Sequence, residues 1–202
     1  KQVNLTCKTS IGKGTFYGCS SLIDINIDTS ENDNCSNFSI GEYAFTQCSS
    51  LQNICLPSCI QIICKSLFEK CSSLNHLEIP SQVNCIDEKA FSECTSLTEI
   101  TIPESIKEIK PFTFNKCTSL TKITIPESVK LIGIGAFKSC KSLEEITIPK
   151  KVFVIKKEVF CDCTSLTKVT IESKLKSIEY AAFKNCISIK TINIPRTVGD
   201  IC

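Results

Sequence analysis

The sequence predicts a solenoid, in which eight coils of about 23 residues stack and align short strands into a parallel sheet. Three observations carry this prediction. A cysteine recurs before a Ser-Leu or Ser-Ile pair, and the last six intervals between these cysteines are each 23 residues long. A phenylalanine precedes every one of these cysteines by three residues, and an alternating apolar segment follows each of them.

The two marker columns extend along almost the whole chain. A single coil of this length cannot enclose its own apolar side chains, but stacked coils turn each column into a continuous buried spine. The cysteine column comprises Cys19, Cys48, Cys71, Cys94, Cys117, Cys140, Cys163 and Cys186. The phenylalanine column comprises Phe16, Phe45, Phe68, Phe91, Phe114, Phe137, Phe160 and Phe183.

Each coil contains one segment of the type Leu-x-x-Ile-x-Ile, as in Leu97, Ile100 and Ile102. Its alternation of apolar and polar residues and its β-branched side chains are typical of a short strand. A proline usually follows and ends the ladder. The Ala-Phe-x-x-Cys segment is too short for a full helix, so we expect a helical turn or a short 3-10 piece on the opposite side of the coil.

The N-terminal part departs from the period, because 29 residues separate Cys19 from Cys48 (48 − 19). The six additional residues (29 − 23) fall in the polar stretch 28–39, which we expect to form an insertion loop. Residues 1–10 are interpreted as a partial N-terminal coil, with an edge strand at residues 3–5. The chain lacks an initiator methionine and stops at Cys202, where a ninth coil would begin, so we expect a truncated single solenoid over 1–202.

The consensus Ile-Gly-x-x-Ala-Phe-x-x-Cys-x-Ser-Leu-x-x-Ile-x-Ile-Pro-x-Ser-Val resembles the BspA-like leucine-rich repeat, and its eight matches cover roughly residues 11–202. The resemblance implies a leucine-rich-repeat solenoid of the horseshoe class, in which the parallel sheet lines the concave side. Members of this family occur on the surfaces of bacteria and parasitic protists, where they are implicated in binding host proteins. The resemblance therefore implies a non-enzymatic binding module, secreted or at the cell surface, with a host surface or matrix protein as its partner.

The polar positions within the strand segments form the candidate binding face, since they point away from the core on the concave side. One column alternates in charge from Glu99 to Lys168, and opposite charges on neighbouring strands stabilise a sheet by about 0.2–1 kcal/mol. A self-neutralising, soluble surface is therefore the alternative to a protein-binding groove. This face contains no aromatic residue, which favours weak or multivalent binding. The candidate residues are Asp24, Asn26, Asn53, His76, Glu78, Glu99, Thr101, Lys122, Thr124, Glu145, Thr147, Lys168, Thr170, Thr191 and Asn193.

The composition and the chain end bear on the partners. Lys and Arg number 23 against 21 Asp and Glu, which leaves a formal net charge of +2 and no basic excess for nucleic acid. No run of about 18 apolar residues exists, so no transmembrane segment is expected. The apolar end of the stack around Val198 and Ile201 is expected to promote end-to-end or dimeric self-association.

Sixteen cysteines raise the question of disulfides. The eight in the ladder column are interpreted as small core residues, because parallel stacked side chains have poor disulfide geometry. Among the others, the pairing that we prefer is Cys64 with Cys85, which lie in adjacent coils close to the same column. Sequons at Asn4, Asn34 and Asn37 are candidate glycosylation sites. A disulfide or a glycan would indicate an extracellular protein.

Two other classes of function stay open. An intracellular scaffold for protein–protein interaction, with every thiol reduced in the cytoplasm, is the alternative to a surface protein. A catalytic pair of Cys55 with His76 lacks a predicted cavity, and a zinc site that adds Cys59 and Cys64 lacks Cys-x-x-Cys spacing. We therefore assign no catalytic residue, no metal and no cofactor.

Overall fold

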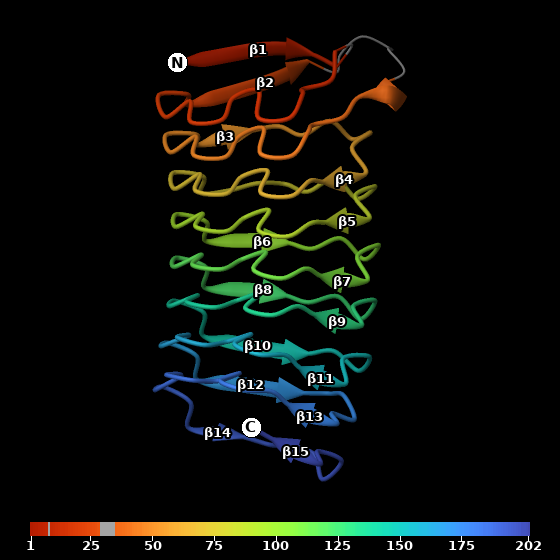
Figure 1. The fold of residues 1–202 in the computed structure, drawn as a ribbon, viewed down its shortest axis with the longest axis vertical. Coiled ribbons are helices and arrows are strands. Elements are labelled where there is room, and N and C mark those ends of the chain that lie inside the picture. The colour runs from red at the N-terminus through yellow and green to blue at the C-terminus, as the bar shows by residue number, and fades with distance from the viewer. Residues whose placement is uncertain (8, 29–34) are drawn as a thin grey trace.

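The structure is a computed structural model that describes residues 1–7, 9–28 and 35–202. Its coils stack along one long axis, with the two chain ends at opposite ends of the stack (Figure 1). Two rows of short parallel strands run along this axis on different sides of the molecule. The solenoid of eight coils that the repeat predicts is confirmed.

The first row is formed by the strand segments, and its pairings follow the repeat. Ile100 pairs with Ile123, and Ile146 pairs with Val169, each partner 23 residues further along the chain. Exposed and buried side chains alternate in these strands, which confirms the predicted pattern. We call the solvent-facing side of this row the strand face. The strands are β1 (Gln2–Thr6), β2 (Asp24–Asp28), β3 (Asn53–Ile54), β6 (Glu99–Thr101), β8 (Lys122–Thr124), β10 (Glu145–Ile148), β12 (Lys168–Ile171) and β14 (Thr191–Ile192).

The second row consists of two-residue strands and goes beyond the sequence prediction. Its buried residues form an apolar column, in which Ile109 pairs with Ile132 and Ile155 pairs with Ile178. Each of these strands is too short to produce an alternating pattern in the sequence. The strands become visible only when the coils are stacked. The strands are β4 (Ile62–Ile63), β5 (Cys85–Ile86), β7 (Glu108–Ile109), β9 (Leu131–Ile132), β11 (Val154–Ile155), β13 (Ser177–Ile178) and β15 (Asp200–Ile201).

The segment around each phenylalanine, which we call the turn side, differs from the helical turn expected there. The residues two before and two after the phenylalanine have positive φ angles in all eight coils. This geometry directs backbone N–H groups to the next coil: Lys89, Phe91 and Glu93 donate to the carbonyl oxygens of residues 111, 113 and 115. A helical turn would keep these bonds within the coil. The turn side therefore joins successive coils with its own ladder of hydrogen bonds.

The core is filled by the predicted columns. Neighbouring phenylalanine rings stack with centroids 5.5–5.6 Å apart along the whole series. Beside them, each ladder cysteine from Cys48 onward donates its thiol to the phenylalanine carbonyl of the preceding coil, as from Cys117 to Phe91 at 3.1 Å. From Cys48 to Cys163 the ladder cysteine is a buried core residue, as predicted, and also a hydrogen-bond donor, which was not predicted. The core prediction is wrong for Cys19, which is exposed, and Cys186 is half-buried, because the turn segment of each has a neighbouring coil on one side only.

The N-terminal region departs from the regular repeat. Strand β1 pairs with β2 over five residues, so the edge strand expected at residues 3–5 is present. Of the expected insertion loop 28–39, residues 29–34 lie outside the described residues. The following residues form the 3-10 helix η1 (Cys35–Asn37), which is the one helix in the described ranges. Phe38 and Ile40 then enter the core.

Candidate binding face

The register places the candidate residues in two columns on the strand face. Glu99 pairs with Lys122, and Glu145 with Lys168, so the alternating charges are nearest neighbours along the stack. The second column is a run of threonines, in which Thr147 lies opposite Thr170. Of the fifteen candidates, Asp24 and Thr170 are half-buried and the others are exposed. The arrangement is the predicted one, while the binding role of these residues stays a prediction.

Ion pairing on the strand face is sparse. Lys168 lies 3.7 Å from Glu145, with side chains 68% and 54% exposed, and this is the one ion pair recorded between described candidate residues. At the N-terminal end, Asn53 donates to the Asp24 carboxylate at 3.1 Å. Exposed pairs contribute about 0–1 kcal/mol because water screens them. These charges are therefore available to a partner at little cost in stability.

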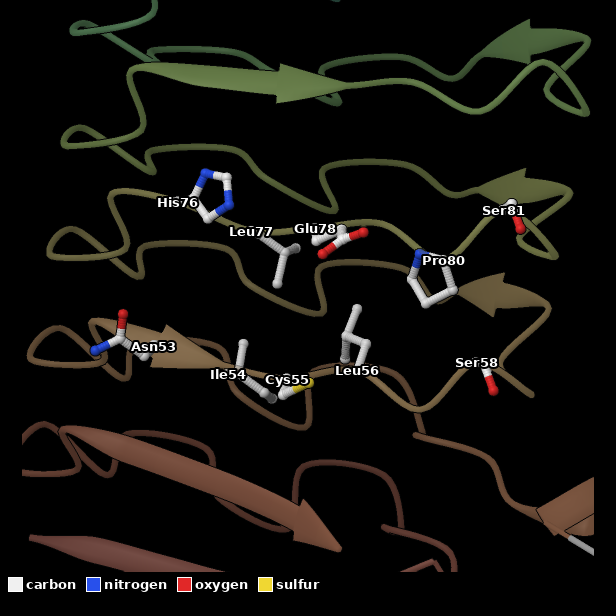
Figure 2. Close-up of a pocket in the computed structure, with 10 residues that line it drawn as sticks. All are labelled: Asn53, Ile54, Cys55, Leu56, Ser58, His76, Leu77, Glu78, Pro80 and Ser81. Atoms are coloured by element: carbon white, nitrogen blue, oxygen red, sulfur yellow. The ribbon is translucent and has the colours of Figure 1, made fainter. Parts of the chain in front are cut away.

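The strand face is hollowed where its ladder is interrupted. No backbone hydrogen bond among the described residues joins residues 53–56 to residues 76–79, and the latter form no strand. A hollow of about 500 Å³ lies over this gap. Figure 2 shows its two rows of lining side chains, which come from consecutive coils and include Cys55 in one row and His76 and Glu78 in the other. No cavity was expected here, because the periodicity of the sequence carries no signal for one.

A second hollow, of about 430 Å³, lies further along the same face. It spans the interruption between β8 and β10, and Lys122, Glu145 and Lys168 line it together with Glu104 and Glu172. It therefore contains both signs of charge. A rigid surface with charged hollows favours polar or charged segments of a partner over a large apolar one.

A further polar column was missed by the sequence analysis. The residue after each strand-face leucine is exposed, and where it is threonine its hydroxyl donates to a carbonyl of the preceding coil. Thr121 bonds Thr98 at 3.3 Å, and Thr167 bonds Glu144 at 3.0 Å. The recurrence of threonine at 23-residue intervals was the available signal. Because these hydroxyls already have partners, the column borders the binding face rather than extending it.

Most of the thiols in the cysteine column are expected to be unreactive at neutral pH. Burial raises the pKa of Cys48 to about 11 and that of Cys140 to about 12, and it raises the pKa of Cys117 well above the usual value. The reactive form of a cysteine is the thiolate, so these side chains remain protonated at neutral pH. They contribute to packing and hydrogen bonding, not to nucleophilic chemistry.

The other cysteines and the histidine form no metal-binding group. The described residues contain no cluster of three or more His, Cys, Asp or Glu side chains with the geometry to hold a metal ion. Cys64 and Cys85 are free thiols in the structure. Cys85 lies opposite Ile62 and not opposite Cys64, which puts the pair on a diagonal of the ladder. The Cys64–Cys85 disulfide stays a prediction with unfavourable geometry.

Two of the three sequons can be located. Asn4 lies on β1 in the same column as Asn26, and Asn37 is the last residue of η1; both side chains are exposed. Asn34 lies outside the described residues. A glycan on Asn4 would stand at the N-terminal edge of the strand face. In the described part of the chain, no helix has the length and apolar character of a bilayer-spanning segment.

Comparison with known proteins agrees with this architecture. The chain is 25% identical to a leucine-rich-repeat protein of T. pallidum, with a TM-score of 0.64 over 93% of this chain and 77% of that one. It is 16% identical to the pneumococcal vaccine antigen PcpA, with a TM-score of 0.53 over 100% of this chain and 62% of that one, a likeness of fold. A comparison with curated protein sequences gives no match.

A sequence model of a repeat family matches nearly the whole chain. The model of the BspA type leucine-rich-repeat region matches residues 2–110 and 85–202, which together span the stacked coils described above. This repeat is a scaffold that generally binds proteins rather than catalyses reactions. The chain belongs to the BspA-type leucine-rich-repeat family.

Proposed function

We propose that this chain is a non-enzymatic protein-binding module that acts at the cell surface or after secretion, and that it docks a host surface or matrix protein on the strand face. The observation that carries the proposal is the contrast in chemistry along one rigid sheet. Buried positions repeat the same residues, whereas the exposed columns vary among His76, Glu99, Lys122 and Asn193. A fixed scaffold with variable exposed residues favours recognition.

The chemistry of the face indicates the kind of interface. Charged groups such as Glu145 and Lys168 are exposed and little engaged with each other, so they remain free to pair with a partner. Complementary charge contributes mainly to association rate and specificity. Without aromatic anchors on this face, we expect modest affinity that falls as salt rises and that increases when several copies act together.

The test is binding to arrays of purified matrix proteins and cell-surface ectodomains, with cytosolic proteins on the same array. The diagnostic variant combines Lys122→Ala, Glu145→Ala and Lys168→Ala. The matched control combines Lys116→Ala, Glu93→Ala and Lys138→Ala, which removes the same charges from the turn side. We expect the diagnostic variant to lose about tenfold in affinity, equivalent to about 1.4 kcal/mol, and the control to bind as the parent does.

Two outcomes would overturn the proposal. Equal losses in both variants would mean that the strand face is not the docking surface. Binding confined to the cytosolic proteins would favour the intracellular scaffold. That second candidate is supported by the exposed free thiols of Cys19, Cys55 and Cys202, because unpaired exposed cysteines suit a reducing compartment.

A separate measurement tests whether the protein is extracellular or intracellular. Protein from the native source is alkylated before and after reduction, and its glycopeptides are mapped by mass spectrometry. A glycan on Asn4, Asn34 or Asn37, or a thiol blocked until reduction, would support the surface protein. Bare asparagines together with sixteen thiols open to alkylation after unfolding would support the intracellular scaffold.

Self-association belongs to the same proposal. In this chain the coil that carries β14 and β15 leaves Ile187, Ile194 and Ile201 exposed. Apolar surface of this kind favours stacking against a second copy. Light scattering should show an average mass that increases with concentration, whereas a constant monomer mass at high concentration would contradict the idea.

A further inference from the structure

Cys35 and Cys59 occupy neighbouring places in successive layers at the N-terminal end. Cys35 begins η1, and Cys59 lies in the turn between Pro57 and Ile60 of the following coil. They are 24 residues apart (59 − 35), one residue off the 23-residue repeat. The segments that carry them lie side by side, because residues 37–40 and residues 59–62 line one shared hollow.

Cys59 occupies a repeat position whose side chain contacts the preceding coil in other layers. At the equivalent position of later coils, hydroxyl groups donate back to the preceding coil: Ser128 bonds the Ile106 carbonyl at 2.6 Å, and Thr197 bonds the Leu175 carbonyl at 2.7 Å. Next to Cys59, the preceding layer is the segment that begins with η1 and carries Cys35. The Cys35 thiol is among the groups that act on the Cys59 thiol, and both cysteines are half-buried against the core.

The segment that carries Cys35 is already anchored on its other side. Ser10 donates from its hydroxyl to the Asn37 carbonyl at 3.2 Å and accepts from the Ser39 N–H at 3.0 Å. The Ile11 N–H donates to the Ser39 carbonyl at 2.9 Å. Residues 35–39 therefore lie between residues 10–11 and the coil of Cys59. A bond to Cys59 would join three consecutive layers at the end of the stack.

We propose that Cys35 and Cys59 are the disulfide site of this protein, and that the bond fastens the N-terminal layers to the coil that follows. The oxidant is a low-molecular-weight disulfide such as oxidised glutathione. One cysteine thiolate attacks it and releases one glutathione thiol; the second cysteine attacks the mixed disulfide and releases the other. The protein loses two hydrogen atoms as the S–S bond forms, and the two glutathione sulfurs are reduced.

Other cysteine pairs are less suitable. Cys64 and Cys85 are 21 residues apart (85 − 64), and the diagonal separates their Cα atoms by about 8 Å, beyond what a disulfide bridges without backbone movement. The thiols of Cys163 and Cys186 also act on each other, but these residues lie one repeat apart in the ladder column, where each thiol donates to a phenylalanine carbonyl. Their side chains are parallel, which opposes the dihedral angle that a disulfide requires.

The bond would act as a redox-sensitive clamp. Terminal coils of a solenoid lose structure first, because each has a neighbour on one side only. A link across residues 35–59 restricts the unfolded end most, so the oxidised protein should unfold about 5 °C higher than the reduced protein. Burial, with the hydrogen bond to Cys35, raises the pKa of Cys59 to about 11, so oxidation should become faster as the pH rises above neutrality.

The experiment oxidises the whole chain with oxidised glutathione and maps the product. No Lys or Arg lies between residues 14 and 64, so trypsin leaves both cysteines in one peptide. Added cleavage after Glu31 and Glu42 separates Cys35 from Cys59. We expect an internal link between the two resulting peptides, with fragmentation placing it on Cys59. Cys35→Ser and Cys59→Ser should each abolish the link and the rise in unfolding temperature.

Cys64→Ser is the control variant, and it should keep both the link and the temperature rise. Circular dichroism under reducing conditions must give parent-like spectra for all three variants, so that loss of the link reports chemistry and not folding. A link that maps to Cys64 and Cys85, or glutathione adducts on Cys35 and Cys59 without an internal bond, would overturn the proposal. The result is independent of whether the strand face binds a host protein.

Discussion

The turn side and the strand face are built on opposite plans. On the turn side, phenylalanine and cysteine recur in every coil, and the same two positions have positive φ. On the strand face, the backbone repeats while the exposed residues change from coil to coil. The first region joins each coil to the next through stacked rings, thiols and N–H groups. The second presents groups that have few partners within the chain.

The difference separates stability from recognition. Substitutions on the turn side should destabilise the stack, and substitutions on the strand face should leave it nearly unchanged. The stack is quasi-one-dimensional, so a central coil gives the clearest measurement, since both of its interfaces are formed. The expected losses of stability decrease from the stacked phenylalanines of the turn side to the charged residues of the strand face.

Phe114→Ala should lower the free energy of unfolding by about 3–5 kcal/mol, because removal of a buried phenylalanine ring leaves a cavity. The ring is fully buried and stacks between Phe91 and Phe137 at 5.5 Å on each side. Denaturant unfolding measures the loss. Phe153→Ala is the control, because that ring is 45% exposed. Equal losses for the two variants would refute a stability role specific to the stacked column.

Cys117→Ala should lower the free energy of unfolding by about 1–2 kcal/mol. The variant leaves a small cavity and loses the hydrogen bond to the Phe91 carbonyl. Cys55→Ala, at an exposed position, should change stability by less than about 0.5 kcal/mol. The same denaturant titration compares them.

Alkylation kinetics provide a second check on the ladder. The raised pKa and the burial of Cys117 should make its alkylation at pH 8 much slower than that of Cys55. Rapid labelling of Cys117 in the folded protein would contradict the packed ladder.

Ser139→Gly should stabilise the protein by about 0.5–1 kcal/mol, because Ser139 has a φ of 60° and glycine adopts this conformation without a Cβ penalty. Gly135→Ala should act in the opposite direction. Gly135 has a φ of 59°, and a Cβ there would collide with the Phe112 ring. Thermal unfolding of both variants tests the sign, and a shift in the same direction for both would contradict the argument.

Lys168→Ala should change stability by less than about 0.5 kcal/mol, because its pair with Glu145 is long and exposed. The variant for comparison is Lys138→Ala, which removes an ion pair of 2.5 Å with the half-buried Glu158. Unfolding at low and at high salt should show little dependence for Lys168→Ala. A loss above about 1 kcal/mol would mean that the strand face is structural.

The N-terminal region shows where repeat reasoning stops being sufficient. The phenylalanine column predicts Phe45 in the core, and Phe45 is buried. The insertion disrupts the frame just before it, so sequence spacing alone favoured Cys64 with Cys85. In the structure the segment of Cys35 lies beside that of Cys59, and the two cysteines are 24 residues apart, one more than the repeat. A one-residue offset is invisible without the neighbouring layer.

The sequence by itself determined the period, the number of coils, the buried columns and the two columns of the strand face. These follow from side-chain chemistry that repeats at a fixed interval, and such a pattern has one way to bury its apolar residues. The tertiary structure alone decided the backbone of the turn side, the second row of strands, the thiol hydrogen bonds and the hollow beside His76. Each of these depends on which N–H or S–H group faces which carbonyl in the next coil, and that is set by the stacking of layers rather than by the residues of any one of them.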